Sequence, residues 1–202
     1  MRYAVNTSAS LFVVDYRTSA VAPFPAALED SYAAYKYLKE IAPDSEIIII
    51  GDSAGGGLAL ATILKVLENS VNSPSRIILN SPWTDLTCSA ETYQTKQEAD
   101  VVLEGVFLKK CAKLYGNGDY KNPYISPIFA DFTGFPPIYI NVGTDEILLD
   151  DSIKLKEIAQ TQGVKVNLNV WDGMFHMFHY WEGFAKESTQ VCKEIYKVID
   201  DN

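Results

Sequence analysis

The sequence predicts an α/β fold, with a mostly parallel sheet of about five strands and helices on both faces. Short apolar runs of strand length alternate along the chain with longer segments of helical periodicity, which is the pattern of βαβ units. One of these runs, Ile47-Ile48-Ile49-Ile50, passes directly into a glycine-rich turn and then into a helix-like segment. With 202 residues, 48% of them hydrophobic, the chain can bury one sizeable core, so we expect residues 1–202 to form a single domain.

The individual elements follow from these patterns in chain order. Strands are expected at residues 11–15, 46–50, 76–80, 138–142 and 165–171. Helices are expected near residues 25–41, 54–69, 151–162 and 182–200. Pro23 and Pro25 open the first helix, and Gly163 follows the third where a C-terminal cap belongs.

Residues 81–137 are less regular than the rest and form an insertion between two strands. One helix is expected near residues 105–115, followed by a return rich in Pro and Gly from Asn122 to Pro137. Long connections of this kind usually cover a site or shape its entrance. We therefore expect the insertion to lie near the functional site.

The turn Gly51-Asp52-Ser53-Ala54-Gly55 has the features of a nucleophile elbow. Gly51 and Gly55 are expected to remove side chains where the strand and helix backbones crowd each other. Ser53 is expected in a strained conformation that exposes its hydroxyl at a helix N-terminus, where negative charge is favoured. Asp52 is interpreted as a brace of the turn. A phosphate-binding glycine turn is the alternative, but the GxGxxG spacing of a dinucleotide loop is absent.

Charge and cysteine content exclude several classes of function. The net charge of −9, the pI near 4.7 and the lack of a Lys/Arg run argue against nucleic acid and anionic membrane surfaces as partners. Cys88, Cys111 and Cys192 are widely spaced, so neither a disulfide framework nor a zinc site is indicated. The run Leu11-Phe12-Val13-Val14 is too short for a signal peptide, and no stretch approaches membrane-spanning length. We expect a cytoplasmic chain without a cofactor, acting on a neutral or apolar small molecule.

A serine hydroxyl needs a base, and the chain has only two histidines. His176 follows the last expected strand in a loop, at the edge of the sheet where catalytic groups gather, and it is the preferred base. His179 lies deeper in the following segment and is the less favoured alternative. An HxxH metal site made by the pair, with Asp172, has no further ligand motif, so no metal is expected.

Asp145 is the predicted acid that orients the base. In the expected chain order the acid lies between the serine and the histidine, and Asp145 follows the strand at 138–142 after a short turn. Its rivals have simpler explanations. Asp150 and Asp151 suit the first turn of a helix, Glu146 is interpreted as a solvated neighbour, and Asp172 precedes a glycine in a turn.

Several motifs occur together in a characteristic order: Val14-Asp15-Tyr16-Arg17, Pro23-Phe24-Pro25-Ala26-Ala27-Leu28-Glu29-Asp30, Gly51-Asp52-Ser53-Ala54-Gly55-Gly56, Ser81-Pro82-Trp83-Thr84-Asp85, Ile125-Ser126-Pro127, Gly143-Thr144-Asp145-Glu146 and Gly173-Met174-Phe175-His176. In them the chain resembles the hormone-sensitive-lipase-like branch of the α/β-hydrolases, which includes bacterial carboxylesterases and acetyl hydrolases, over nearly its whole length. The resemblance implies a serine esterase for short-chain acyl esters, with Ser53 as nucleophile, His176 as base and Asp145 as acid.

The chain departs from this family at its N-terminal side. In relatives a His-Gly-Gly-Gly loop, cap helices and the first strands precede the Asp-Tyr-Arg strand, so the chain is interpreted as a truncated α/β-hydrolase. Among the oxyanion donors only the Ala54 amide is matched by position. The missing strand would lie between those at 11–15 and 46–50. Either these two strands pair directly, or an open edge invites aggregation, a partner or a homo-oligomer.

Three hypotheses about function follow. The first is hydrolysis of short-chain carboxylic esters through an acyl-enzyme on Ser53. The second is a catalytically impaired or inactive fragment, because the loss of one oxyanion donor typically costs about 10²–10³ in rate. The third is a related acyl-transfer or peptidase activity on the same residues. Trp83, Phe175 and Phe178 are expected to line the site and to favour small apolar acyl groups.

Overall fold

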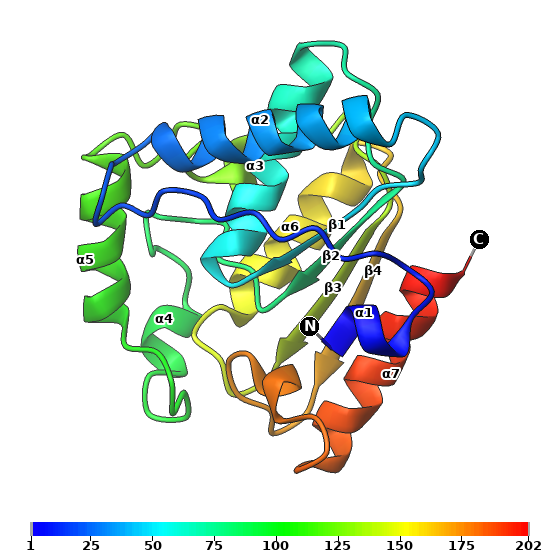
Figure 1. Ribbon diagram of the computed structural model, residues 1–202. Helices are drawn as coiled ribbons and strands as arrows, with labels where there is room; N and C mark the ends of the chain where they lie inside the picture. Colours follow the sequence, from blue (N-terminus) through cyan, green and yellow to red (C-terminus); the bar gives the residue numbers. More distant parts are fainter. Residues whose placement is uncertain (1, 202) are drawn as a thin grey trace.

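The computed structural model describes residues 2–201, and at its centre lies a sheet of four parallel strands in the order β1-β2-β3-β4 (Figure 1). The strands are β1 (Ile48–Asp52), β2 (Arg76–Asn80), β3 (Ile138–Gly143) and β4 (Val166–Trp171). Ile77 of β2 pairs with Ile138 of β3, and Leu79 pairs with Ile140. Because alternate residues of a strand face the same side, these pairs form apolar rows on one face of the sheet.

The expected strand at residues 11–15 does not form, and this corrects the prediction of about five strands. Within residues 2–201 this segment has no strand partner, and Leu11, Phe12 and Val13 are 40%, 44% and 75% exposed. A groove of about 590 Å³ lies between residues 11–14 and residues 47–52. A strand forms only where its backbone groups can hydrogen-bond to a neighbouring strand. The groove separates this segment from β1, so those hydrogen bonds cannot form. Of the two arrangements expected, the structure has the open edge of β1.

The long helices form close to where the periodicity predicts them. They are α2 (Ala26–Ile41), α3 (Ala54–Glu68), α5 (Gly105–Gly116), α6 (Leu149–Thr161) and α7 (Lys186–Asp200), and the short ones are α1 (Arg2–Asn6), α4 (Thr92–Thr95), η1 (Pro127–Phe129) and η2 (Phe178–Trp181). Gly163 follows α6 with φ +84°, as expected of a C-terminal cap. Helix α7 begins later than expected because η2 and Gly183, with φ +86°, interrupt the helical path.

Helices cover both faces of the sheet. Helices α3 and α6 pack on one face, where Leu60, Leu155 and Leu79 of β2 belong to one buried apolar cluster. Helix α7 packs on the other face, where Ile195 and Ile78 of β2 belong to a second buried apolar cluster, and α1 lies beside α7 (Figure 1). Burial of each such side chain contributes roughly 1.5–3 kcal/mol, so both layers hold the sheet in place.

The insertion at residues 81–137 packs beside the carboxyl ends of the strands. Its apolar side chains, including Trp83, Leu103 and Leu108, form a cluster with Ile147 and Leu148, which lie just before α6. This contact fixes the insertion to the loop that follows β3. In the part of the chain described here, no helix combines the length and the apolar character needed to cross a bilayer.

Candidate active site

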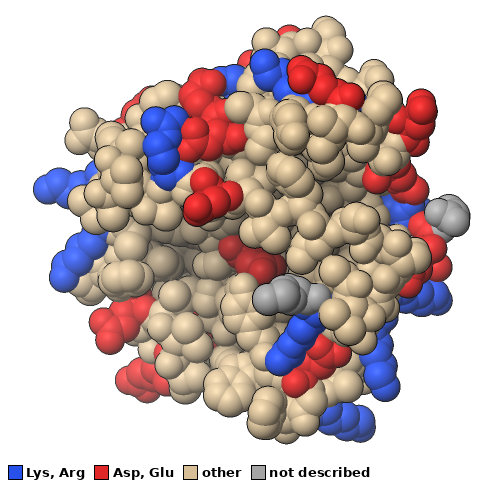
Figure 2. Space-filling model, in the orientation of Figure 1, with Lys and Arg blue, Asp and Glu red and all other residues tan. Residues whose placement is uncertain are grey.

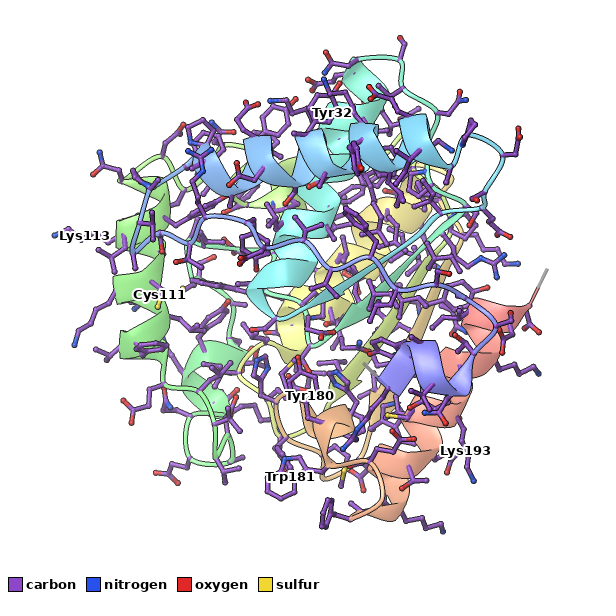
Figure 3. The ribbon with its side chains drawn as sticks, in the orientation of Figure 1. Tyr32, Cys111, Lys113, Tyr180, Trp181 and Lys193 are labelled. Atoms are coloured by element: carbon purple, nitrogen blue, oxygen red, sulfur yellow. The ribbon has the colours of Figure 1, made fainter. Side chains whose placement is uncertain are left out.

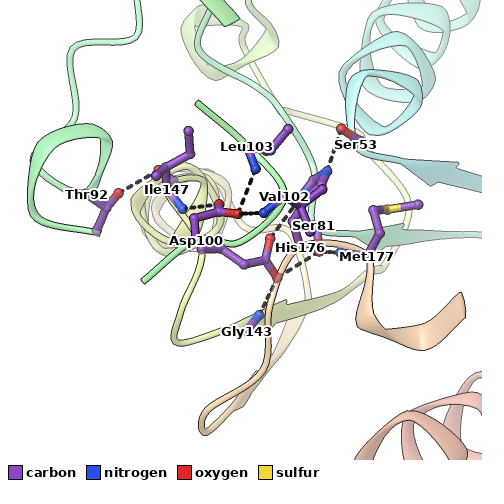
Figure 4. A network of polar contacts seen from close by, with 11 residues as sticks. Ser53, Ser81, Thr92, Asp100, Val102, Leu103, Gly143, Ile147, His176 and Met177 are labelled. Atoms are coloured by element: carbon purple, nitrogen blue, oxygen red, sulfur yellow. Dashed lines mark hydrogen bonds and ion pairs between the residues drawn. The ribbon is translucent and has the colours of Figure 1, made fainter. Parts of the chain in front are cut away.

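The carboxyl ends of the strands bring one polar network together (Figure 4). Ser53 follows β1, Ser81 follows β2, Glu146 follows β3 and His176 follows β4. Because the strands are parallel, their carboxyl ends lie at the same edge of the sheet. Residues up to 123 positions apart in the chain therefore come into hydrogen-bonding contact.

The elbow places Ser53 in the strained conformation expected from the sequence, with φ +53° and ψ −121°. Gly51 is required there, because a Cβ at this position would lie 2.4 Å from the carbonyl oxygen of Gly55. Gly55 itself is not crowded, which corrects its expected role, since a Cβ there would lie 3.9 Å from Tyr16 Oη. The crowding falls instead on the next two glycines, which pack against Pro82 and Trp83.

The hydroxyl of Ser53 points at the imidazole of His176, with 2.9 Å between Oγ and Nε2. On the other side of the ring, Nδ1 lies 3.0 Å from Oε2 of Glu146. A carboxylate can only accept, so Nδ1 carries a proton and donates it, and Nε2 is left to accept the Ser53 hydroxyl proton. His176 is 4% exposed and Glu146 is fully buried, so water is largely excluded from this contact.

The structure corrects the choice of the carboxylate, because Glu146 and not Asp145 contacts His176. Asp145 points outward, its side chain is 40% exposed, and its Oδ1 lies 4.0 Å from Nζ of Lys96. Glu146 folds back beneath the turn, where the Gly143 N–H donates to its Oε1 at 2.6 Å. The fully buried Ile147 and Leu148 that follow were the available sequence signal, since they draw the start of α6 inward.

Ser81 is a further member of the network that the sequence reasoning missed. Its hydroxyl donates to Oε1 of Glu146 at 2.8 Å and accepts the Met177 N–H at 3.2 Å. The residue is buried and has φ +48°, so the end of β2 is bent to present this hydroxyl. Ser81 thereby joins the loop of the carboxylate to the loop of His176.

Asp52, interpreted from the sequence as a brace of the turn, links the elbow to β2 and to η2 by hydrogen bonds. It accepts from Nδ2 of Asn80 at 2.8 Å and from Oη of Tyr180 at 3.0 Å. The second histidine, His179, lies at ion-pair distance, with its Nε2 3.7 Å from Asp52 Oδ1. Burial alone would raise the pKa of Asp52, but His179, Asn80 and Tyr180 together leave that pKa below its ordinary value.

Ser53 and Ala54 open onto a pocket of about 310 Å³, at the small end of the range for ligand pockets. Its walls come mainly from the insertion and are apolar, and none of the lining residues is charged: Tyr16, Thr18, Ser19, Ala27, Ser53, Ala54, Gly57, Leu58, Trp83, Leu86, Leu103, Phe107, Leu108, Cys111, Tyr115, Tyr124 and Ile125. In Figure 2 this side of the molecule is hollowed, and most charged side chains lie nearer the outline. Figure 3 shows Cys111 on the inner side of α5, opposite the outward-pointing Lys113.

Two of the three aromatic residues expected in the pocket lie elsewhere. Trp83 lines the pocket, whereas Phe178 is buried against Trp171 on the α7 side of the sheet, and Phe175 packs against the same cluster. The reason is that the chain after β4 turns toward α7 and not toward the insertion. Among residues 2–201, no three His, Cys, Asp or Glu side chains are grouped so that they could hold a metal ion.

Fold and site together define an α/β-hydrolase arrangement, and comparison with known proteins agrees. A family model described as alpha/beta hydrolase fold matches residues 1–180, so the chain belongs to this family. An acetyl-hydrolase of Streptomyces hygroscopicus is 36% identical over 187 residues, which are 92% of this chain and 62% of that protein. An esterase of Acinetobacter venetianus is also 36% identical, over 98% of this chain and 67% of that protein.

Solved structures of related proteins superpose closely. A hormone-sensitive lipase from a metagenome library has a TM-score of 0.95 and 40% identity, over 98% of this chain and 67% of that one. The esterase EstE5, whose crystal was soaked with p-nitrophenyl butyrate, has a TM-score of 0.93 at the same identity, and the match again covers 98% of this chain and 67% of that one. The chain thus spans about two thirds of the length of the relatives it matches.

Proposed function

We propose that this chain is a serine-dependent hydrolase of short-chain carboxylic esters that works through an acyl-enzyme. The observation that supports this most strongly is the continuous series of contacts from Ser53 through His176 to Glu146 at the mouth of an apolar pocket. A hydroxyl, an imidazole and a buried carboxylate in this order are the constellation of nucleophilic acyl transfer. The names of the relatives, acetyl-hydrolase and esterase, support the same reaction class.

In the proposed mechanism, Ser53 Oγ attacks the ester carbonyl carbon while Nε2 of His176 takes the hydroxyl proton. Glu146 keeps the imidazole in the required tautomer and stabilises the imidazolium that forms. The tetrahedral intermediate collapses, the C–O bond to the alcohol breaks, and His176 returns the proton to the departing alkoxide. A water molecule, deprotonated by the same imidazole, then attacks the acyl-enzyme and releases the acid and free Ser53.

The Ala54 amide is the proposed donor to the oxyanion of the tetrahedral intermediate. Ala54 is the first residue of α3, directly follows Ser53 and lines the same pocket. A helix N-terminus carries unpaired N–H groups and a partial positive charge, which favour a developing negative charge. This role rests on the position of Ala54 next to the nucleophile.

The pocket supports an uncharged, small apolar acyl group as the bound part of the substrate. A charged group would have to leave water without a partner, because no lining residue carries an opposite charge. Leu86, Leu103 and Phe107 instead provide an apolar surface for the acyl chain. Each methylene group buried against such a surface stabilises the bound substrate by about 0.8 kcal/mol. We also infer a cytoplasmic location, which the three free thiols support.

The test is hydrolysis of p-nitrophenyl butyrate by the purified chain beside two variants. Ser53→Ala is expected to lose all turnover above the buffer rate, whereas Ser45→Ala, on the exposed loop before β1 and so at the opposite end of that strand from Ser53, is expected to match the parent. Equal rates for the parent and Ser53→Ala would remove Ser53 from the mechanism.

The open edge of β1 favours a second candidate, an impaired α/β-hydrolase in which the three residues meet but turnover is slow. An unpaired strand edge with exposed apolar residues beside it promotes association with another chain, including a second copy. Size-exclusion chromatography and heat unfolding separate the two candidates. A cooperatively unfolding monomer with turnover typical of esterases contradicts the second candidate, whereas slow turnover by an associated chain supports it.

A further inference from the structure

Asp100 is a buried carboxylate in the insertion, and both of its oxygens accept hydrogen bonds from backbone amides (Figure 4). Oδ1 accepts the N–H groups of Val102 and Leu103, each at 2.9 Å, within the same loop. Oδ2 accepts the N–H of Ile147, also at 2.9 Å, from the loop that follows β3. The first pair of contacts is a local turn, but the third joins two segments 47 positions apart.

The amide that Asp100 holds belongs to the peptide group of Glu146. Because a peptide group is planar, the N–H of Ile147 and the Cα of Glu146 move as one rigid unit. The carbonyl of Ile147 is held as well, by the Thr92 hydroxyl at 2.9 Å. The insertion therefore holds the backbone on the C-terminal side of Glu146 by hydrogen bonds. The Gly143 N–H and the Ser81 hydroxyl donate to the carboxylate of Glu146.

The other oxygen of Asp100 fixes a wall of the substrate pocket. Leu103, whose N–H it accepts, lines the same pocket as Ser53. One buried side chain thus sets the position of a pocket residue and of the carboxylate that orients His176. A buried hydrogen bond to a charged acceptor is stronger than one between neutral groups, so these bonds favour one arrangement of the two loops over others.

We propose that Asp100 is a positioning residue that places Glu146 against His176 through the Ile147 amide. Through the Leu103 amide, the same carboxylate also holds a wall of the pocket in place. The proposal rests on the proposed esterase function for its kinetic consequence, but its structural consequence does not depend on turnover. If Asp100 releases the Ile147 amide, Glu146 loses its fixed backbone and the contact with His176 Nδ1 loosens.

Asp100→Asn tests the link selectively. The single amide oxygen of asparagine satisfies two N–H groups if it faces Val102 and Leu103, and this choice turns the NH₂ group toward the Ile147 N–H. Two donors then face each other, so the local turn survives and the bond to the loop of Glu146 is lost. Asp85→Asn is the matched control: Asp85 is equally buried in the same insertion, but the hydrogen bonds that its carboxylate accepts come from Thr87 and Ser89, two and four positions away.

The first readout is the proton NMR signal of His176 Nδ1–H, which reports the contact with Glu146 without any substrate. We expect this low-field signal to shift upfield or to broaden in Asp100→Asn and to stay in place in Asp85→Asn. The second readout is steady-state hydrolysis of p-nitrophenyl butyrate, where kcat is expected to fall on the order of 10- to 100-fold in Asp100→Asn. If the parent shows the signal but no turnover, the proposed function fails while the positioning role is still tested.

Thr92→Val provides a milder variant should Asp100→Asn unfold. It removes the hydroxyl that holds the Ile147 carbonyl and retains the shape of the side chain. The same signal is expected to shift in the same direction, by less. An unchanged Nδ1–H signal in both variants, or an equal change in Asp85→Asn, would overturn the proposal.

Discussion

Glu146→Gln replaces one carboxylate oxygen of the proposed triad by an NH₂ group and leaves the size of the side chain unchanged. The Gly143 N–H, 2.6 Å from Oε1, is a backbone donor that cannot turn away. The glutamine must therefore keep its oxygen at that position and turn its NH₂ group toward Nδ1 of His176. Nδ1 then has to accept, and the ring proton moves to Nε2, where it blocks transfer from Ser53.

The expected loss is about 10³–10⁴ in kcat, the size typical of a triad histidine held in the wrong tautomer. Such a factor corresponds to roughly 4–5 kcal/mol of transition-state stabilisation. Asp145→Asn is the control one residue away. It weakens an exposed ion pair 4.0 Å from Lys96 and leaves an amide oxygen that can still accept the Thr144 hydroxyl. Exposed pairs contribute about 0–1 kcal/mol to stability, so turnover is expected to stay within about 2-fold of the parent.

Both variants are assayed with p-nitrophenyl butyrate at saturating concentration, together with their urea unfolding curves. The unfolding curves show whether a loss of rate reflects chemistry or misfolding. A large loss in Asp145→Asn with near-normal turnover in Glu146→Gln would refute the assignment of the carboxylate.

The remaining predictions concern the supports of the site and the pH dependence of stability. Ser81→Ala is expected to lower kcat/KM about 10-fold and stability by about 1–3 kcal/mol, because it leaves the Met177 N–H without an acceptor; unchanged ester hydrolysis and urea unfolding would contradict this. Gly143→Ala is expected to unfold at distinctly lower urea concentration, because its Cβ would lie 1.9 Å from the Met174 carbonyl oxygen, and a parent-like midpoint would refute the close approach. Burial raises the pKa of Asp151 from 3.8 to about 7, so the folded chain binds a proton that the unfolded chain releases, and the free energy of unfolding falls as the pH rises from about 4 to above 7. Asp151→Asn removes this slope, and equal slopes in urea unfolding of parent and variant between pH 5 and pH 8 would show that the group does not titrate there.

The parts of the fold that sequence predicts well are those where local pattern and tertiary packing agree. The apolar runs of β2 and β3 are largely buried on both faces and those of β1 and β4 are partly buried, so periodicity and flanking turns suffice to place them. Residues 11–15 have an equally apolar pattern, but a strand also needs a hydrogen-bonding neighbour. That neighbour is a property of the assembled sheet and is not written in the segment itself.

The site shows the same division. The position of Gly51 two residues before Ser53 and the strained conformation of Ser53 follow from the local geometry of the elbow. The location of His176 at the site follows from its place in the loop after the last strand. The choice between Asp145 and Glu146 depends on which of two adjacent side chains turns inward, and that is set by packing of Ile147 and Leu148 against the insertion. The apolar pair itself is visible in the sequence, but the distant residues of the insertion against which it packs are not indicated by any local pattern.

The proposed mechanism requires that the Ser53 oxygen becomes covalently acylated with the help of His176. Peptide mass spectrometry after treatment with phenylmethylsulfonyl fluoride tests it directly, because this reagent modifies activated serine hydroxyls. We expect a single adduct on the peptide that contains Ser53, formed far more slowly in His176→Ala. An unmodified Ser53, or modification at the same rate in His176→Ala, would contradict it.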